Sequence, residues 1–360
     1  MTDIEVLLDE MIEKEATDLH ITVGAPVQFR IAQKLVSSNS TIVTAELARG
    51  LIYSLLTPEQ RDEFEHMREL DFSFGRDDRA RFRGNVFLER GNIACAIRYL
   101  PSNILSFREL GLPDITEEVI KKSRGLVLVT GATGSGKSTT LASMLQRISE
   151  ERACHIITIE DPIEYVFHHK RSIVHQREVG KDTESFGHAL KYCLREDPDV
   201  IFVGEMRDIE TMRFALTAAE TGHLLLSTLH TNSAVSSIER IIDVFPSAQH
   251  RQIRTQLAAT MEAIFSQALL PGTGGGLVLA VEVLTATPAV RAMIRDGREH
   301  EIYGSIQTGQ KYGMQTFNMS LARLVKSGEV RRSVALSYTR NSEELKRMLE
   351  EKEVKNSPQR

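Results

Sequence analysis

Residues 125–140 read Gly-Leu-Val-Leu-Val-Thr-Gly-Ala-Thr-Gly-Ser-Gly-Lys-Ser-Thr-Thr. Within this stretch, residues 131–138 match the pattern G-x-x-x-x-G-K-[ST], between an apolar run typical of a strand and a segment that can begin a helix. Gly134 and Gly136 lack a Cβ, so backbone amides can close around a phosphate group, and the N-terminus of the following helix adds a partial positive charge. The pattern therefore predicts a phosphate-binding loop for ATP, in which Lys137 reaches the β- and γ-phosphates and Ser138 holds Mg²⁺. The residues expected around the phosphates are Gly131, Ala132, Thr133, Gly134, Ser135, Gly136, Lys137, Ser138 and Thr139.

Strand-like and helix-like segments alternate after this motif. Strands are predicted at 125–130, 155–160, 199–203 and 223–229. Because helices are expected between them, the alternation predicts an α/β domain with a mainly parallel sheet covered by helices. Beyond residue 245 the pattern is mostly helical, apart from a strand predicted at 277–284.

The part of the chain before the motif has a different pattern. A helix is predicted at 4–15, a β-hairpin at 18–31, helices at 44–56 and 58–69, and further strands within 71–100. These segments predict a smaller α+β domain. Residues 101–115 show no regular period and predict a linker. The expected division is therefore 1–100 for the first domain, 101–115 for the linker and 116–360 for the second domain.

Composition narrows the class of protein. The chain has 360 residues with 44 basic and 49 acidic side chains, a net charge of −5, so we expect no nucleic-acid partner held by overall charge. Its apolar runs are far shorter than the roughly 20 residues of a membrane-spanning helix. The acidic N-terminal segment lacks the basic start of a secretory signal. Three scattered cysteines predict buried thiols in a reducing cytosol rather than a disulfide framework or a zinc site.

Two acidic segments follow predicted strands, at the edge where open α/β sheets bind ligands. Residues 160–164 read Glu-Asp-Pro-Ile-Glu, and Glu205 follows the run Asp-Val-Ile-Phe-Val-Gly. An acid at a strand end is often only solvated, but beside a complete phosphate loop we favour a role in hydrolysis for both segments. Hydrolysis needs a group that orients water and a second residue, besides Ser138, that binds Mg²⁺. Glu205 suits the second role, with a contact to the metal through water.

Residues 221–231 read Thr-Gly-His-Leu-Leu-Leu-Ser-Thr-Leu-His-Thr, an apolar strand with a histidine at each end. A lone histidine is most often structural. His230, at the carboxyl end, is placed to donate to a γ-phosphate, whereas we expect His223 to contact a neighbouring element. A zinc site has little support because no third ligand has suitable spacing.

Arginines gather in the predicted strands of the first domain, at Arg79, Arg81, Arg83 and Arg98. Such a group is commonly a solvated basic face. Because alternate strand residues point the same way, Arg81, Arg83 and Arg98 are expected to share one face. Guanidinium groups brought from another domain or subunit would stabilise charge on a transferring phosphoryl group.

Together these segments resemble the secretion and pilus ATPases of the RecA-like class, and within them the branch that retracts type IV pili. Four stretches carry the resemblance: 131–140 is similar to the Walker A motif, 159–164 to the Asp box, 194–208 to the Walker B motif and 217–231 to the His box. The resemblance extends over nearly the whole chain. It identifies Glu164 with the catalytic glutamate and Glu205 with the Walker B acid. It also identifies Arg81, Arg83 and Arg98 with the basic residues that reach nucleotide from the first domain.

The resemblance implies a PAS-like N-terminal domain, a RecA-like ATPase domain and a homohexameric ring. It implies ATP hydrolysis that drives pilin disassembly, pilus retraction and twitching motility. The implied location is the cytoplasmic face of the inner membrane, where the ring is peripheral and not inserted. The implied partners are an inner-membrane pilus platform protein and a paralogous retraction ATPase.

Two features depart from the retraction branch. Ala132 stands where these enzymes usually carry proline, a feature shared with the accessory retraction paralogue. The motif Ala-Ile-Arg-Asn-Leu-Ile-Arg-Glu is replaced at 289–296 by Ala-Val-Arg-Ala-Met-Ile-Arg-Asp. An accessory retraction ATPase therefore remains an alternative. A RecA-like nucleic-acid motor would need a basic track with interleaved aromatic residues, which the sequence does not show, and a non-hydrolysing scaffold is disfavoured by intact Glu164 and Glu205.

Overall fold

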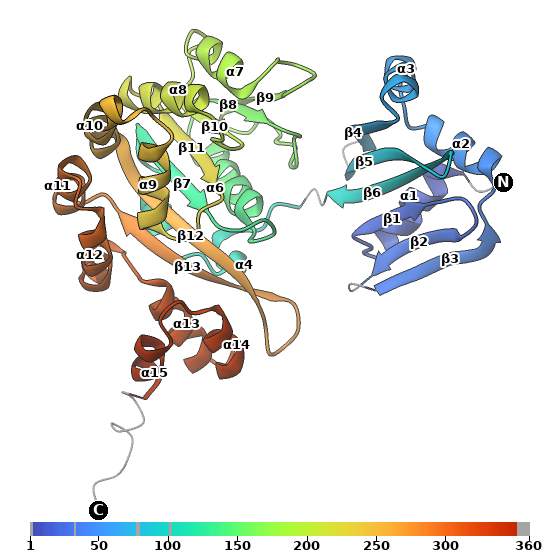
Figure 1. Ribbon diagram of the computed structural model, residues 1–360. Coiled ribbons are helices and arrows are strands. Elements are labelled where there is room, and N and C mark those ends of the chain that lie inside the picture. The colour runs from blue at the N-terminus through green and yellow to red at the C-terminus, as the bar shows by residue number, and fades with distance from the viewer. Residues whose placement is uncertain (1–2, 32–33, 77–79, 101–102, 351–360) are drawn as a thin grey trace, which may run out of the picture. The chain divides into compact units, whose positions relative to one another are not determined.

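The computed structural model describes residues 3–31, 34–76, 80–100 and 103–350 (Figure 1). The chain separates into two compact units, Met1–Asn103 and Ile104–Arg360.

The first unit is built on a six-stranded antiparallel sheet with the strand order β3-β2-β1-β6-β5-β4. Apolar residues on one face of the sheet pack with the helices into a single core. The predicted small α+β domain is confirmed. The elements are α1 (Ile4–Glu13), β1 (Asp18–Ile21), β2 (Pro26–Ile31), β3 (Lys34–Ile42), α2 (Ala45–Tyr53), α3 (Pro58–Met67), β4 (Glu69–Arg76), β5 (Ala80–Glu89) and β6 (Asn92–Leu100).

The second unit is a seven-stranded sheet with the order β13-β12-β7-β11-β10-β8-β9, parallel except for β13. The predicted α/β class with a mainly parallel sheet is therefore confirmed. Its strands are β7 (Gly125–Thr130), β8 (His155–Glu160), β9 (Ile173–Glu178), β10 (Val200–Val203), β11 (Leu224–Leu229), β12 (Met261–Pro271) and β13 (Leu277–Thr285). Its helices include α6 (Lys137–Glu151), α7 (Phe186–Cys193), α8 (Ile209–Glu220), α9 (Ala234–Asp243), α10 (His250–Thr260), α11 (Pro288–Asp296), α12 (Ile302–Thr308), α13 (Phe317–Lys326), α14 (Arg332–Tyr338) and α15 (Ser342–Glu350).

Helices cover both faces of this sheet. Along β7, Leu126 and Leu128 pack into the core shared with α8, α9 and α10, whereas Val127 and Val129 pack into the core shared with α6. Because successive strand residues point to opposite faces and both faces are buried, the central strands are continuous apolar runs. Helices α13–α15 pack in a smaller core against β12 and β13 (Figure 1).

Two strands of the second unit were not expected. β12 lies where a mostly helical pattern was predicted, and β9 (Ile173–Glu178) lies between the predicted strands 155–160 and 199–203, where helices were expected. β12 is buried along most of its length, so its apolar run has no alternation that separates a strand from a buried helix. In the first unit, β3 was also missed, because its sequence Lys-Leu-Val-Ser-Ser-Asn-Ser-Thr-Ile is largely polar and its pairing with β2 comes from the backbone.

The predicted linker at 101–115 is wrong from Ile104 onward. Ser106 and Glu109 form a capping box that starts α4 (Phe107–Leu110), and α5 (Ile115–Val119) follows. The hydroxyl of Ser143 on α6 donates to the carbonyl of Leu105 at 2.6 Å. This segment is too short for a visible helical period, but its side chains pack on the α6 face of the second unit.

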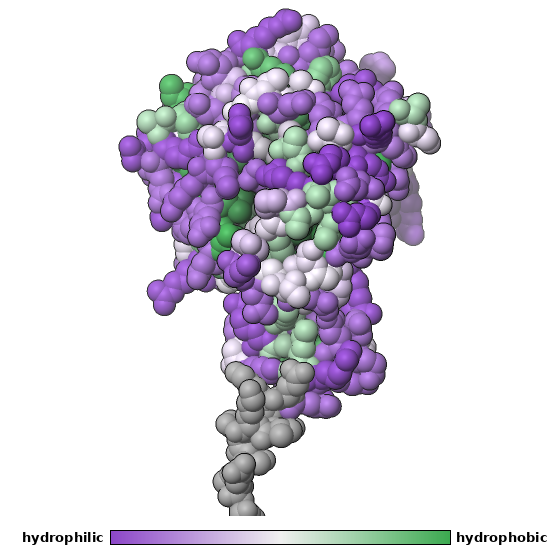
Figure 2. Space-filling view, turned by 90° about the vertical axis from the view of Figure 1, so that its left-hand side faces the viewer, coloured by the Kyte–Doolittle hydropathy of each residue, from purple (hydrophilic) through white to green (hydrophobic). Residues whose placement is uncertain are grey.

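The face of the second unit shown in Figure 2 is mainly polar, and its apolar side chains form small separate patches. Among residues 3–31, 34–76, 80–100 and 103–350, no helix is long and apolar enough to cross a membrane.

Candidate functional site

The phosphate-binding loop joins β7 to α6 and depends on glycine at three positions. Gly131, Gly134 and Gly136 have φ angles of 148°, 78° and 85°, in the region that favours glycine. A Cβ on Gly131 would lie 2.4 Å from the carbonyl oxygen of Gln267 and 2.5 Å from the hydroxyl of Ser135, so a larger residue does not fit. At Gly134, nothing lies within 4 Å of the same position, which leaves open space at the tip of the loop.

Lys137 is the first residue of α6 and points back into the loop. Its ammonium group donates to the carbonyl oxygens of Gly131 at 2.9 Å and of Ala132 at 3.0 Å. Burial lowers the pKa of Lys137, and the nearby carboxylates of Glu205 and Glu164 oppose that shift. Both predicted acids therefore lie close to this ammonium group. Ser138 and Thr139 follow on the first turn of the same helix, half-buried.

A glutamine on β12 fastens the loop to the sheet. The buried amide of Gln267 donates to the carbonyl of Ser135 at 2.7 Å and accepts from the hydroxyl of Thr140 at 3.1 Å. The hydroxyl of Ser135 is itself buried without a hydrogen-bond partner among the described residues. Gln267 was not predicted as a site residue. The only signal was a polar Ser-Gln pair inside an apolar run.

The two acidic segments are brought together by the pairing of β8 with β10. Ile159 lies opposite Val203 in this parallel pair, so residues 160–164 and Glu205 leave the sheet at the same edge. The phosphate loop leaves the same edge, because β7 runs parallel to β11 and β11 to β10. The sequence prediction that these motifs share one end of the sheet is in agreement with this register.

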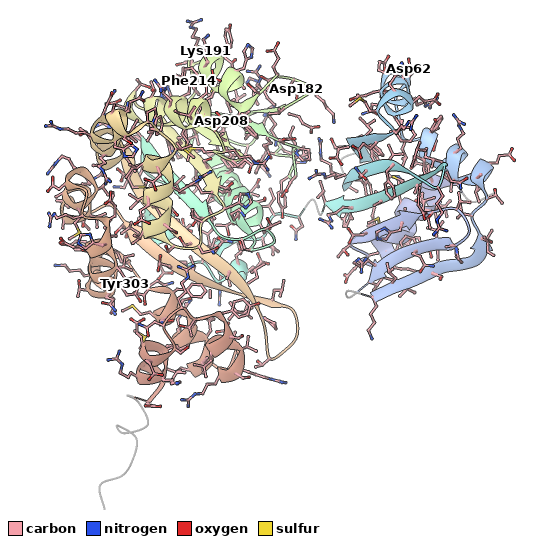
Figure 3. The ribbon with its side chains drawn as sticks, viewed as in Figure 1. Asp62, Asp182, Lys191, Asp208, Phe214 and Tyr303 are labelled. Atoms are coloured by element: carbon pink, nitrogen blue, oxygen red, sulfur yellow. The ribbon has the colours of Figure 1, made fainter. Side chains whose placement is uncertain are left out.

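Glu205 contacts a histidine and an arginine. Its carboxylate lies 2.6 Å from Nε of Arg207 and 3.3 Å from Nε2 of His230. The side chain of Glu205 is only 12% exposed, whereas that of His230 is 49% exposed. Asp208, the N-cap of α8, accepts from the backbone and the hydroxyl of Thr211, each at 2.8 Å, and so fixes the end of this loop (Figure 3).

Glu160 is the most buried acid of the site and supports the loop that carries Glu164. Its carboxylate accepts from the hydroxyl of Thr158 at 2.6 Å, from the amide of Gln176 at 3.0 Å and from the backbone N–H of Glu164. Burial raises the pKa of Glu160 to about 7, against these hydrogen bonds. Gln176 also donates to the carbonyl of Tyr165 at 2.8 Å. Glu160 and Gln176 thus fix the backbone on both sides of Glu164.

Residues 1–275 match the family described as type II/IV secretion system protein. The chain belongs to this family. It is 45% identical over 333 residues to the type IV pilus retraction ATPase PilT of Pseudomonas aeruginosa, which covers 92% of this chain and 97% of that protein.

Other relatives also match over almost the whole length. A twitching motility protein of Neisseria gonorrhoeae is 43% identical, covering 95% of this chain and 91% of that protein. The type IV pilus ATPase PilU of Pseudomonas aeruginosa is 39% identical, covering 96% and 91%. A crystal structure of the pilus retraction motor PilT with bound ADP superposes with a TM-score of 0.91 at 47% identity, covering 96% of this chain and all of that one. The predicted resemblance to the secretion and pilus ATPases is confirmed.

The histidines predicted in the family's His box lie at opposite ends of β11. His230 is at the phosphate edge beside Glu205. His223 precedes the strand at the other edge, where its Nδ1 lies 2.9 Å from the carbonyl oxygen of Ala218 on α8. The structure therefore brings His230 into the site and leaves His223 outside it, as a contact to a neighbouring element.

The arginines of the first unit share one face of its sheet, as predicted. Arg83 on β5 lies opposite Arg98 on β6, and Arg81 is two residues along the same strand. Arg98 donates to Asp18 at 2.9 Å, Arg83 lies 3.6 Å from Asp71, and Arg81 donates to Ser73 at 3.3 Å. Their contact with a nucleotide stays a prediction. Arg79 lies outside the described residues.

Proposed function

We propose that the chain is an ATP-hydrolysing motor that drives pilin disassembly, and hence type IV pilus retraction and twitching motility. One observation carries this proposal: a glycine loop with its lysine lies beside Glu164 and Glu205 in a chain that matches the pilus retraction ATPase PilT over almost its full length. In the proposed assembly, the chain forms a homohexamer at the cytoplasmic face of the inner membrane and acts on a pilus platform protein.

The loop suits the phosphates of ATP. The space beside Gly134 is open, which leaves room for a phosphate group, and the buried hydroxyl of Ser135 would supply one more donor for a phosphate oxygen. The N-terminus of α6 and the ammonium of Lys137 add positive charge. Arg81, Arg83 and Arg98, brought from the first unit of the same or a neighbouring subunit, would complete the charge around the γ-phosphate.

The residues present also suit Mg²⁺, which prefers hydroxyl, carboxylate and water oxygens. Ser138 would hold the ion directly, and Glu205 would hold it through water. The bound ion would neutralise charge that develops on the phosphate oxygens. The fit is supported by Glu205, whose negative charge acts on the ammonium group of Lys137, the residue before Ser138 on α6.

In the hydrolytic step, Glu164 accepts a proton from water while the water oxygen bonds to the γ-phosphorus. The bond from that phosphorus to the bridging oxygen breaks, and ADP and phosphate are released. Lys137 and the arginines stabilise the transferring group, and His230 donates a hydrogen bond to it. Glu160 does not touch the reacting atoms; it holds the backbone of Glu164 in place.

The direct test is turnover by Lys137→Ala. The variant should keep the fold and lose ATP hydrolysis, because the ammonium is lost from the loop. A Lys311→Ala variant is the matched control. Lys311 is an exposed lysine that lies outside the phosphate-binding loop. Hydrolysis by Lys137→Ala at the wild-type rate would place the active site elsewhere.

A second candidate is an accessory retraction ATPase, as the PilU relative suggests. The side chain of Ala132 is exposed at the tip of the loop, where the retraction branch usually carries proline. The altered motif on α11 packs against α10. Arg291 donates to the carbonyls of Ala258 and Ala259 at 2.8 Å and 2.9 Å, and Val290 is buried.

A deletion strain separates these functions. Loss of a main retraction motor should leave cells hyperpiliated and non-motile, whereas loss of an assembly motor leaves cells without pili. If the strain keeps retracting pili and fails only when a second retraction ATPase is also deleted, the chain is the accessory enzyme.

A further inference from the structure

Residues 230–233 form the loop between β11 and α9, which we call the His-box loop. It contacts residues of the predicted nucleotide site. His230 at its start meets Glu205. The hydroxyl of Thr231 lies 2.6 Å from that of Ser237, which donates to the hydroxyl of Thr130 at 3.5 Å. Thr130 directly precedes the phosphate loop. The position of the His-box loop is thus linked both to the predicted magnesium-holding acid and to the strand that enters the phosphate loop.

A buried carboxylate joins this loop to the C-terminal helices. Glu282 on β13 is 3% exposed and accepts from the backbone N–H of Ala234 at 2.8 Å, the first residue of α9. The same carboxylate accepts from the backbone N–H of Phe317, the first residue of α13. Because helix N-termini carry partial positive charge, one anion stabilises both. Glu282 therefore couples the end of the His-box loop to the start of the C-terminal helices.

Arg340 makes a second connection from the same helices. It lies between α14 and α15, and its guanidinium donates to the backbone carbonyl of Asn232 in the His-box loop. Its positive charge also favours the ionised form of Glu282 and opposes the rise in the pKa of that carboxyl caused by burial. Arg340 thus contacts the His-box loop and, through its charge, stabilises the carboxylate that caps α9.

The backbone around Arg340 is itself firmly held. The amide of Asn318 on α13 donates to the carbonyl of Asn341 at 3.1 Å and accepts from the hydroxyl of Thr339. The nearly buried carboxylate of Glu344 on α15 accepts from the hydroxyl of Tyr303 on α12 at 2.8 Å; Figure 3 labels Tyr303. Contacts with α13 therefore hold residues 339–341 in place, and the bond between α12 and α15 holds the start of α15 just beyond them.

We propose that Arg340 is a positioning residue of the hydrolytic site: it holds the His-box loop where His230 meets Glu205, so that turnover depends on the placement of α13–α15. The inference rests on the proposed hydrolysis of ATP. Arg340 touches neither nucleotide nor reacting atoms and acts through Asn232. Removing it frees the loop without removing any residue of the phosphate-binding loop, so the rate of the chemical step should change more than nucleotide binding.

The experiment measures steady-state ATP hydrolysis by the full chain carrying Arg340→Ala. We expect kcat to fall about ten-fold, the lower end for loss of a hydrogen bond from a charged donor at an exposed position, with KM for ATP within about two-fold of the wild-type value. Arg340→Lys keeps the charge and one donor and should recover part of the rate. Arg331→Ala is the matched control: this exposed arginine precedes α14, and its side chain makes no hydrogen bond or ion pair with the described residues, so kcat should not change.

A double-variant comparison tests the route through His230. If Arg340 acts by placing His230, the variant His230→Ala/Arg340→Ala should be no slower than His230→Ala alone. The inference is wrong if the fold-reduction in kcat of the double variant equals the product of the fold-reductions of the two single variants. It is also wrong if Arg340→Ala has the same kcat as Arg331→Ala. If Arg340→Ala does not fold, Arg340→Lys replaces it in the same comparison. Absence of ATP hydrolysis by the wild-type chain would instead refute the proposed function.

Discussion

Gln267 offers a test of how much nucleotide binding depends on a residue that never needs to touch the nucleotide. Its amide makes two hydrogen bonds to the phosphate loop, to Ser135 at 2.7 Å and to Thr140 at 3.1 Å, and its side chain is buried. Gln267→Met keeps nearly the same volume and removes both bonds. It also leaves the carbonyl of Ser135 without this donor.

The magnitude follows from these two bonds. Loss of the bond from Thr140 costs about 1 kcal/mol net, and the carbonyl of Ser135 left unpaired costs about 1–3 kcal/mol, so the free energy that stabilises the loop falls by roughly 2–4 kcal/mol. Since about 1.4 kcal/mol corresponds to ten-fold in affinity and the loop can relax, we expect the lower end, an increase of about 30-fold in Kd for ADP.

Isothermal titration of ADP into the purified variant measures this effect. Gln256→Met is a matched control, because Gln256 donates to Glu220 at 2.6 Å on the exposed side of α10 and has no contact with the loop. The control should bind ADP as the wild type does. A Kd for Gln267→Met within two-fold of the wild-type value, with the fold intact, would refute the reasoning.

Three further predictions concern the acids and the assembly. Glu164→Gln should bind ATP nearly normally and hydrolyse it about 10²- to 10⁴-fold more slowly, because the proposed general base is lost, whereas Glu205→Gln should also alter the dependence of the rate on Mg²⁺. Hydrolysis rates measured across a Mg²⁺ titration distinguish the two variants. If Glu164→Gln hydrolyses ATP normally and Glu205→Gln is slow with an unchanged dependence on Mg²⁺, the two roles are reversed. Burial raises the pKa of Glu160 in the folded state to about 7 from an ordinary value of 4.5, so the folded state binds more protons and the free energy of unfolding should fall as the pH rises through that window. Glu160→Gln should reduce this dependence on pH, measured by denaturant unfolding between about pH 5 and pH 8. An unchanged dependence would mean that another group is responsible. Light scattering in ATP and Mg²⁺ should show six copies of the chain, and a fully active monomer would exclude a site shared between subunits.

The predictions made from the sequence succeed where the conformation of a short segment depends on its own residues alone. The phosphate loop is set by glycines at positions whose φ angles are positive, and those positions are fixed within eight residues of chain. Likewise, the acids at 160–164 and 205 could be placed at one edge of the sheet because parallel strands start and end together. The shared face of Arg81, Arg83 and Arg98 follows from the two-residue period of a strand.

Other parts of the site were decided by contacts between distant segments. Gln267 contacts the phosphate loop from a distant strand, at a sequence separation of 132 from Ser135, whose carbonyl it binds. β12 itself was missed because a run buried on both faces has no period of its own, and only its pairing with β7 and β13 identifies it as a strand. Arg340 meets Asn232 across 108 residues, and nothing in either local sequence marks the pair. The sequence by itself thus determined the geometry of the predicted phosphate-binding loop, because that geometry is local. The tertiary structure alone decided what holds those groups in place, because a buried polar side chain takes whichever partner the folded chain brings within hydrogen-bond distance.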